Sequence, residues 1–230
     1  MTPTKKYRLS PTGLGLYRDC PRCFWLHHVV KLRRPQGPFP SLPNGMDLVI
    51  KKYADGFRRI GGVPPELALA VDEHTKLFSG IRKLRLWRSN FVGIEWRTPE
   101  GHVLRGAIDD LLVRKGKLIP LDYKTRMGPP KPDTAGYYVD QLSCYALLFE
   151  KNGFSVENYG LLQFWWPLEL NAPEEVWFST EVVRVPVDTR RAESLFTDAI
   201  ALLEGPIPPY DGKCLWCKRI KDGEALAMLL

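Results

Sequence analysis

Two apolar runs flank a short basic segment in Val103-Leu-Arg-Gly-Ala-Ile-Asp-Asp-Leu-Leu-Val-Arg-Lys-Gly-Lys-Leu-Ile-Pro-Leu-Asp-Tyr-Lys-Thr125. A Gly between long polar residues in such a segment predicts a tight turn that joins two antiparallel strands. If Lys115-Gly116 is a two-residue loop, counting outward from it pairs Asp109 with Asp122. The sequence therefore predicts a central β-hairpin with two acids directly opposite each other.

Two facing acids in a sheet need a positive charge beside them, because like charges placed directly opposite are destabilising. Strand alternation puts Asp122 and Lys124 on one face and turns Tyr123 to the other. A divalent cation would neutralise the acids, and Lys124 is placed to hold or deprotonate a water beside it. The alternative is a surface hairpin with solvated acids, and a three-residue loop would shift the pairing by one residue. The register favours a metal site.

A helix is expected downstream of the hairpin, beginning at Asp133 or Thr134 and ending near Lys151. Gln141 falls within its apolar stripe. A Gln in that position needs a hydrogen-bond partner, which a catalytic Lys, a water or a phosphate would supply. The alternative is a Gln at the edge of the stripe, bonded to solvent.

Three motifs in order carry a family resemblance: Gly106-Ala-Ile-Asp109, then Asp122-Tyr-Lys124, then Gln141-Leu-Ser-Cys-Tyr145. The set resembles the RecB branch of the PD-(D/E)XK nucleases, and the resemblance covers most of the chain. It implies an α/β fold in which a mixed β-sheet with a central β-hairpin is flanked by helices.

The resemblance also implies roles for these residues. Asp109 and Asp122 would hold Mg²⁺ or Mn²⁺ together with the Tyr123 backbone carbonyl. Lys124 would orient the attacking water and stabilise the charged transition state, and Gln141 would lie beside the metal site or contact phosphate.

Family members often carry a His or Glu on a helix before the hairpin, and Asp47 is the nearest substitute in this chain. Asn44 or Gly45 is expected to cap that helix, after an ordered loop that runs from Gln36 to Gly45. Asp47 fits a catalytic role and equally fits a first-turn acid that the helix dipole favours.

The composition is that of a globular protein, with 44% hydrophobic and 26% charged residues, and residues 1–230 are expected to form a single domain. The net charge of +7 favours a polyanionic partner. The run from Ile81 to Arg88 could follow a phosphate backbone with Trp87 stacked on a base, or it could be a helix with a solvated basic face. No secretory signal or membrane-length apolar run is evident, so a cytoplasmic protein without membrane contact is expected.

Four of the five cysteines form two C-x-x-C pairs, Cys20 with Cys23 and Cys214 with Cys217. Two such pairs can complete a tetrahedral thiolate site for zinc or for an iron–sulfur cluster. The remaining Cys144 is expected to be a small core residue. A metal site would tie together two segments almost two hundred residues apart.

Some RecB-type nucleases, including those of CRISPR spacer acquisition and of AddAB complexes, carry an iron–sulfur cluster that joins the two ends of the nuclease domain. Their pattern resembles one N-terminal and three C-terminal cysteines, whereas this chain has two and two. The resemblance favours a 4Fe-4S cluster, with structural zinc as the alternative.

The combined interpretation is a metal-dependent DNA nuclease acting in repair, recombination or CRISPR-type defence, with DNA and possible protein subunits of such complexes as its partners. The rival interpretation is a non-catalytic basic module, stapled by a metal, that binds nucleic acid or protein. Retention of Asp109, Asp122 and Lys124 argues for the enzyme, because a binding module has no need of all three.

Overall fold

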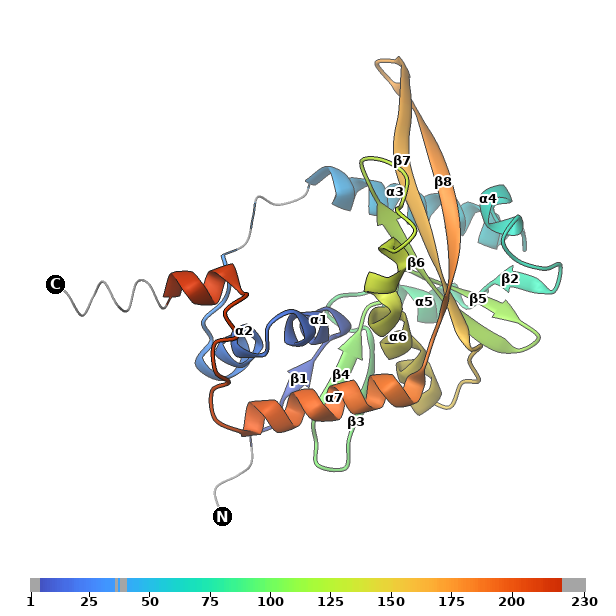
Figure 1. Cartoon of the computed structure of the whole chain (residues 1–230). Helices are drawn as coiled ribbons and strands as arrows, with labels where there is room; N and C mark the ends of the chain where they lie inside the picture. Colours follow the sequence, from blue (N-terminus) through green and yellow to red (C-terminus); the bar gives the residue numbers. More distant parts are fainter. Residues whose placement is uncertain (1–4, 36, 38–40, 221–230) are drawn as a thin grey trace.

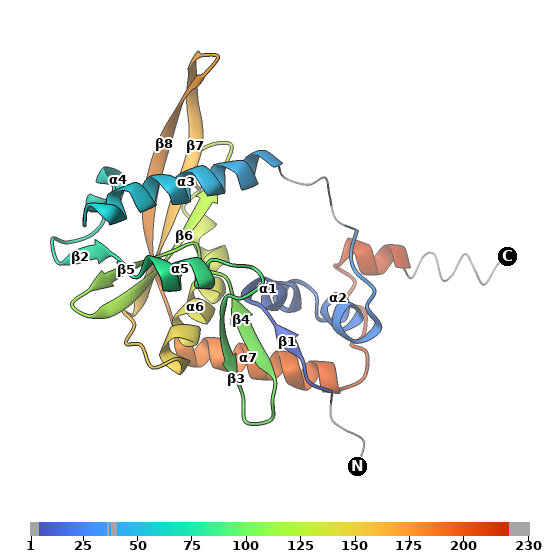
Figure 2. The ribbon, with the colours of Figure 1, turned by 180° about the vertical axis from the view of Figure 1, so that it is seen from behind.

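The computed structural model describes residues 5–35, 37 and 41–220, which form a mixed α/β fold with two sheets (Figures 1 and 2). The small sheet has the strand order β1-β4-β3 and the large sheet the order β2-β5-β6-β7-β8. The strands are β1 (Arg8–Leu9), β2 (Thr75–Leu77), β3 (Ile94–Arg97), β4 (Val103–Gly106), β5 (Asp110–Arg114), β6 (Lys117–Thr125), β7 (Tyr159–Ala172) and β8 (Glu175–Pro186).

The helices are α1 (Pro11–Asp19), α2 (Pro21–Trp25), the π-helix η1 (Leu26–Val30), α3 (Ser41–Arg59), α4 (Pro65–Ala68), α5 (Ile81–Trp87), the 3-10 helix η2 (Thr134–Tyr138), α6 (Val139–Lys151) and α7 (Thr189–Glu204). A further helical turn covers residues 215–220. The fold class expected from the sequence, a mixed sheet with a hairpin at its centre and helices around it, is confirmed.

The central hairpin is formed by β5 and β6. Lys115 and Gly116 have φ values of 48° and 82°, the positive values that a two-residue type I′ loop requires. The predicted register is correct at the turn, where Arg114 pairs with Lys117.

The far end of that hairpin differs from the prediction. The segment Val103–Gly106 pairs as β4 in the small sheet, and the chain crosses to the large sheet before β5 begins at Asp110. The last rung of the ladder joins Asp110 to Leu121, so Asp109 and Asp122 are not a ladder pair. The physical reason is the change of sheet, because the Asp109 carbonyl accepts a hydrogen bond from Arg88 Nε at 2.7 Å outside the ladder.

The large sheet is mixed because β6 and β7 are parallel while its other pairs are antiparallel. The crossover between the parallel strands contains α6, which packs on one face of the sheet, and α3 packs on the other face (Figures 1 and 2). Alternate residues of β6 serve the two faces: Leu118 belongs to the core with α6, and Ile119 to the core with α3.

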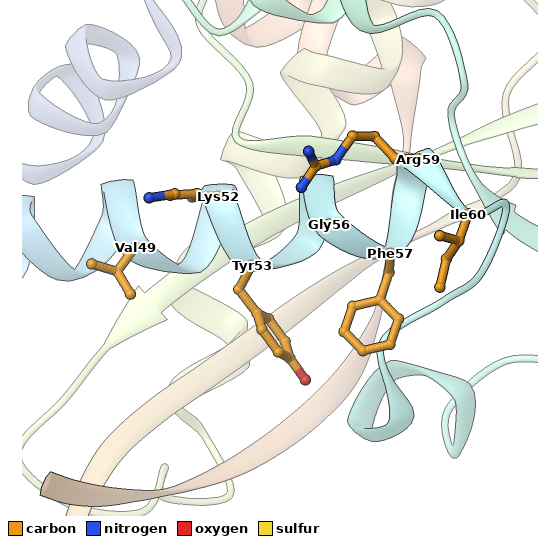
Figure 3. Close-up of a pocket in the computed structure, with 7 residues that line it drawn as sticks. All are labelled: Val49, Lys52, Tyr53, Gly56, Phe57, Arg59 and Ile60. Atoms are coloured by element: carbon orange, nitrogen blue, oxygen red, sulfur yellow. The ribbon is translucent and has the colours of Figure 1, made fainter.

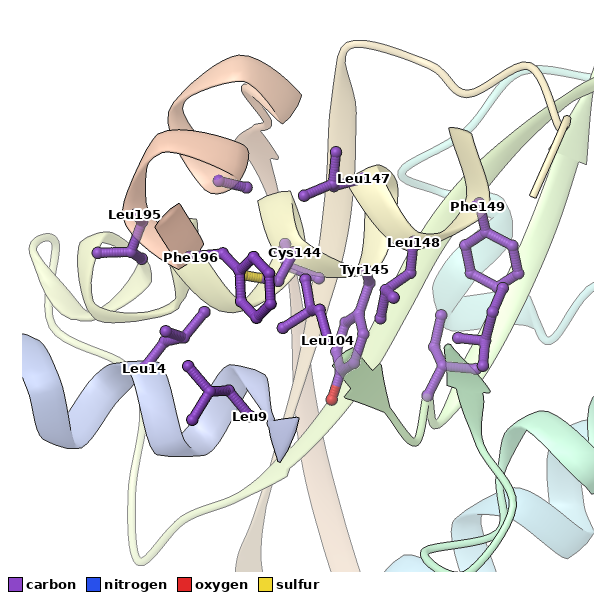
Figure 4. Packing of buried hydrophobic residues seen from close by; sticks show 14 of the residues in the cluster. Leu9, Leu14, Leu104, Cys144, Tyr145, Leu147, Leu148, Phe149, Leu195 and Phe196 are labelled. Carbon is purple, nitrogen blue, oxygen red and sulfur yellow. The ribbon is translucent and has the colours of Figure 1, made fainter. Parts of the chain in front are cut away.

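The larger core surrounds α6, whose residues from Leu142 to Phe149 are all buried. Figure 4 shows side chains of α6 packed against Leu104 of β4 and against Leu195 and Phe196 of α7. This helix is covered on several sides, so its position relative to β6 is fixed by packing. The residues that α6 directs toward the sheet are therefore held in fixed positions relative to β6.

Two helices begin at a residue whose side chain caps the first turn. Ser10 accepts a hydrogen bond from the Gly13 N–H at 3.0 Å before α1, and Asp188 caps α7, which Gly205 follows as the C-cap. The expectation of a cap at Asn44 or Gly45 is wrong, because α3 already includes both residues from its start at Ser41. Pro43 is tolerated there, since a first-turn residue has no intrahelical partner for its missing N–H. The loop was predicted to run from Gln36 to Gly45, but residues 41–45 belong to α3, and of residues 36–40 only Gly37 lies within the described residues.

The strands β7 and β8 form a long hairpin that projects past the rest of the molecule (Figure 1). The pairing of these two strands continues through Pro167 and on to Ala172. The register shifts twice, between Pro167 and Glu169 and between Leu170 and Ala172, where one strand carries an extra residue.

Candidate active site and cysteine cluster

Asp109 lies in the connection between β4 and β5, where it reaches the next strand. Its Oδ2 accepts a hydrogen bond from the Tyr123 N–H at 3.0 Å. Its Oδ1 forms an ion pair with Lys51 Nζ at 2.7 Å. Asp109 therefore stands beside the segment that the sequence predicted it would face, although it is not in the ladder.

Asp122 and Lys124 project from β6 on the side of α6, as strand alternation predicted. Lys124 Nζ lies 2.5 Å from Asp122 Oδ2. Gln141 of α6 donates to Asp122 Oδ1 at 3.1 Å, and its own Oε1 is 3.4 Å from Lys124 Nζ. The Gln141 side chain thus bridges Asp122 and Lys124, and these two residues are its hydrogen-bond partners. We call Asp109, Asp122, Lys124 and Gln141 the acidic site.

The electrostatics of Asp122 are those of a buried acid beside another acid. Burial, and after it the charge of Asp109, raise the pKa of Asp122 to about 7 in spite of the opposing effect of Lys124. Asp122 Oδ2 is buried and has an ion pair but no hydrogen bond of adequate geometry. A buried carboxylate oxygen with remaining acceptor capacity, close to a second carboxylate, fits a hard divalent cation.

Lys51 is a member of this neighbourhood that the sequence analysis did not identify. It lies on α3, one turn after Asp47, and its Nζ contacts Asp47 Oδ2 at 2.8 Å as well as Asp109. Burial lowers the pKa of Lys51, but Asp109 and Asp47 outweigh this effect, so its pKa ends above the ordinary value. Asp47 reaches Asp109 only through this ammonium group. The i, i+4 spacing of Asp47 and Lys51 on a helix is the feature of the sequence that could have indicated this ion pair.

A second charged network lies behind the acidic site and is centred on Asp110, which is fully buried. Its carboxylate accepts from Arg58 Nη2 at 2.5 and 2.7 Å, from Arg88 Nη2 at 2.9 Å and from the Tyr123 hydroxyl at 2.9 Å. Because Arg88 also holds the Asp109 carbonyl, this network fixes the backbone from which the Asp109 carboxylate projects. Asp109 and Asp110 are adjacent in the sequence but take part in different networks, because Asp110 begins β5 whereas Asp109 lies in the connection before it.

Tyr145 connects α6 to the break between the two sheets. Its hydroxyl donates to the Ala107 carbonyl at 2.9 Å and accepts from Gln141 Nε2 at 3.1 Å. Gly106 permits this contact, since a Cβ at that position would stand 2.8 Å from the Tyr145 ring. The approach of α6 to the acidic site therefore depends on a residue without a side chain.

A groove between α3 and α5 opens beside the acidic site, with a volume of about 840 Å³. Lys51 lines it, and so do Lys52, Arg59 and Arg85. These last three are exposed and form no hydrogen bond or ion pair with any other described residue. Figure 3 shows Lys52 and Arg59 projecting from α3 on the side away from Tyr53 and Phe57.

The basic run of α5 differs in part from the prediction. The suggestion that Trp87 stacks on a base is wrong, because its ring packs in an edge-to-face arrangement against Phe149 and Phe154. Arg88 is held in ion pairs with Asp55 and Asp110 and is not a free phosphate contact.

The two C-x-x-C pairs meet, which is the arrangement that the sequence predicted. The four sulfur atoms of Cys20, Cys23, Cys214 and Cys217, which we call the four-cysteine cluster, all lie within 4.8 Å of one another. Among the described residues this is the group of three or more potential ligands that gathers in one place. Cys144 is buried in the core around α6, as expected.

The four-cysteine cluster is supported by the elements around it. Cys20 caps α2 by accepting from the Cys23 N–H, while Cys214 and Cys217 lie at the helical turn 215–220. Trp25 Nε1 donates to the Gly205 carbonyl at 3.0 Å, which fixes the end of α7 against α2. Arg34 Nη2 lies 3.3 Å from Cys214 Sγ and brings a positive charge to the sulfurs.

Comparison with known protein families agrees with this architecture. Residues 66–220 match the PD-(D/E)XK nuclease superfamily, a span that includes the acidic site and the second cysteine pair. The crystal structure of SSO0001 is similar to the chain, with 16% sequence identity, a TM-score of 0.41 and coverage of 93% of this chain and 84% of that chain. No curated protein matches the chain.

The chain belongs to the PD-(D/E)XK nuclease superfamily. This membership supports nuclease activity and a nucleic acid substrate. None of the helices in the described part of the chain has both the length and the apolar composition that a membrane span needs.

Proposed function

We propose that this chain hydrolyses phosphodiester bonds in DNA with Mg²⁺ or Mn²⁺, and that residues 1–230 form one nuclease domain. The observation that carries the proposal is the convergence of the acidic site from three elements, with a buried oxygen of Asp122 left without a hydrogen bond. Asp109, Asp122 and the Tyr123 carbonyl would hold the ion. A bound divalent cation supplies polarisation of the phosphate and neutralises developing charge.

The side chains of the acidic site have distinct tasks in this proposal. Lys124, held between Asp122 Oδ2 and Gln141 Oε1, is positioned to orient the attacking water and to stabilise negative charge on the phosphate. Gln141 is itself oriented by Tyr145, so the position of Lys124 depends on α6. Lys51, which pairs with Asp109 Oδ1, is the ammonium group that would compete with a cation for this carboxylate.

The groove between α3 and α5 supports a path for the phosphate backbone. Lys52 and Arg59 lie on α3 with Lys51, and Arg85 lies on α5, which ends just before Arg88. Lys51 and Arg88 contact Asp109, whereas the other three basic side chains pair with no other described residue. A polyanion in this groove would therefore lead to the acidic site. We further propose a role in DNA repair, recombination or CRISPR-type defence, with protein subunits of such complexes as partners, which rests on the RecB-type motifs.

Incubation with labelled single-stranded DNA, double-stranded DNA and RNA, in Mn²⁺ or in EDTA, tests the activity. We expect Mn²⁺-dependent cleavage of DNA, and a fall of at least about a hundredfold in Asp122→Asn and in Lys124→Ala. Asp140→Asn is the matched control, since this α6 carboxylate pairs with Arg18 and Arg191, outside the acidic site. Full activity in Asp122→Asn, or binding of DNA without cleavage by the parent, would contradict the proposal.

Salt dependence of DNA binding tests the groove. Each phosphate contact contributes about −0.9 to the log-log slope on duplex DNA, so alanine at Lys52, Arg59 and Arg85 is expected to make the slope shallower by roughly 3. The matched control changes Lys76, Arg82 and Lys83, which are exposed and unpaired but lie outside the groove. An equal change of slope in both triple variants would show a diffuse basic surface.

A further inference from the structure

The spacing of the four sulfur atoms distinguishes between kinds of metal centre. Cys23 Sγ lies 3.2 Å from Cys217 Sγ and 3.5 Å from Cys214 Sγ, and Cys20 Sγ lies 3.7 Å from Cys217 Sγ. All four sulfurs lie within 4.8 Å of one another. The sulfurs thus form a tight group whose dimensions can be compared with the geometry of tetrahedral thiolate sites.

Four thiolates that share one ion with bonds of about 2.3 Å stand about 3.8 Å apart, since this is the edge of a tetrahedron with that radius. Four thiolates on a 4Fe-4S cubane bind four different irons around a larger core, so their sulfurs stand roughly 6 Å apart. The three sulfur–sulfur contacts are slightly shorter than the first value, and every pair of these sulfurs lies closer together than the second value.

We infer that the four-cysteine cluster binds a single Zn²⁺ ion, and that the 4Fe-4S cluster implied by the resemblance does not fit these residues. The sequence pattern agrees, because two C-x-x-C pairs are a usual ligand set of structural zinc, whereas one N-terminal and three C-terminal cysteines is the pattern of the cluster nucleases.

Burial and charge around the sulfurs are consistent with a closed structural site. Cys20, Cys23 and Cys217 are each only 2% exposed, and Leu16, Tyr210 and Trp216 pack against them. Four thiolates on one Zn²⁺ carry a net charge of −2, and Arg34 supplies a guanidinium 3.3 Å from Cys214 Sγ. All four positions are filled by protein ligands, so this ion would have no open position for catalysis.

Metal analysis of the whole chain, produced with added iron and a co-expressed iron–sulfur assembly system and purified without oxygen or chelator, tests this inference. These conditions favour a cluster wherever one fits. We expect one zinc per chain, no acid-labile sulfide and no visible colour. A brown protein with about four irons and four sulfides per chain would overturn the inference. One iron per chain without sulfide would equally overturn the assignment to zinc.

Variants at the half-buried Cys214 keep the test informative even where folding suffers. Cys214→His should retain one zinc per chain, because imidazole is an ordinary zinc ligand, while Cys214→Ala should lose most of it. Cys144→Ala is the control and should keep the parent zinc content. Cobalt offers a second readout, since Co²⁺ in four thiolates gives strong tetrahedral absorption bands that Cys214→Ala should remove. Retention of full zinc in Cys23→Ala would contradict the site. Neither readout depends on nuclease activity.

Discussion

The acidic site and the four-cysteine cluster are both polar groups gathered in the fold, but they are assembled over different distances along the chain. Contacts among the acidic-site residues and Tyr123 join residues 2 to 19 positions apart. Sulfur–sulfur contacts between the two C-x-x-C pairs join residues 191 to 197 positions apart. The first is a consequence of one hairpin and the helix after it, whereas the second requires the whole domain to fold.

This difference suggests a division of roles. The acidic site holds like charges together with the help of Lys51 and Lys124, an arrangement that costs stability and suits chemistry. The four-cysteine cluster closes a very long loop, an arrangement that suits stability. Substitutions in the acidic site should therefore mainly lower activity, whereas substitutions in the four-cysteine cluster should mainly lower stability.

The largest effect is expected from Cys23→Ala. A cross-link over 194 residues restricts the unfolded chain by about 5 kcal/mol on the loop-entropy estimate used for disulfides, and ligand binding adds to this. Loss of the link should lower the melting temperature by roughly 10 to 20 °C, measured by calorimetry. Cleavage per folded molecule at a low temperature should change little. A variant with the melting temperature of the parent would show that the four-cysteine cluster does not cross-link the chain.

Gly106→Ala should affect both properties, because the new Cβ would stand 2.8 Å from the Tyr145 ring, and Tyr145 orients Gln141. We expect a loss of about 1 to 3 kcal/mol of stability, as for other overpacked sites. Turnover should fall about tenfold or more, since Lys124 loses its support. The control is Gly15→Ala in α1, where no atom lies within 4 Å of the added Cβ and no loss of stability is expected. Equal stability and equal turnover in the two variants would show that Gly106 is not needed for the approach of Tyr145.

How far the sequence predicts this fold depends on the range of the interaction. The turn at Lys115 and Gly116 follows from neighbouring residues, and its prediction was correct. The start of α3 was wrong because several residues there could begin a helix, and local preference did not decide among them.

The neighbours of the acidic site were harder to predict. Gln141 was identified because a polar residue in an apolar stripe needs a partner, and its contacts with Asp122 and Lys124 supply one. Lys51 and Arg58 were missed because their contacts depend on how α3 is placed across the sheet, which is a tertiary property. The cysteines were paired by motif alone, without any knowledge of the path between them.

Lys51→Met tests whether this ammonium group competes with the divalent ion for Asp109. It contacts Asp109 Oδ1 at 2.7 Å, so its removal should leave a carboxylate oxygen available and strengthen Mn²⁺ binding several-fold. Calorimetric titration of the inactive Lys124→Ala background avoids any contribution from turnover. Weaker binding of Mn²⁺ after the substitution would show that Lys51 organises the acids instead of competing for them.

The smallest effect concerns acid sensitivity near the four-cysteine cluster. His28 packs against Phe24, and burial, followed by the charges of His27, Lys31 and Lys5, lowers its pKa from 6.5 to about 4. The unfolded chain therefore binds more protons between these values, and the contribution of His28 to stability is lost as the pH falls from about 6.5 through about 4.

Denaturant unfolding at pH 7 and pH 5 measures this contribution. His28→Phe should lose less stability than the parent over that interval, whereas zinc release by acid is common to both proteins and cancels in the comparison. An identical pH dependence in the two proteins would contradict the assignment to His28.

The four-cysteine cluster also has a consequence for the order of synthesis. A ribosome makes Cys20 and Cys23 early and reaches Cys217 only 194 residues after Cys23, which takes roughly 10 to 40 s at ordinary elongation rates. Both sheets and α6 can fold during that interval, before the last two sulfurs exist. Release of a chain that stops short of Cys214 would leave two unliganded thiols and no closed site. A metal bound by all four cysteines would therefore distinguish chains that extend past Cys217 from chains that stop short of Cys214.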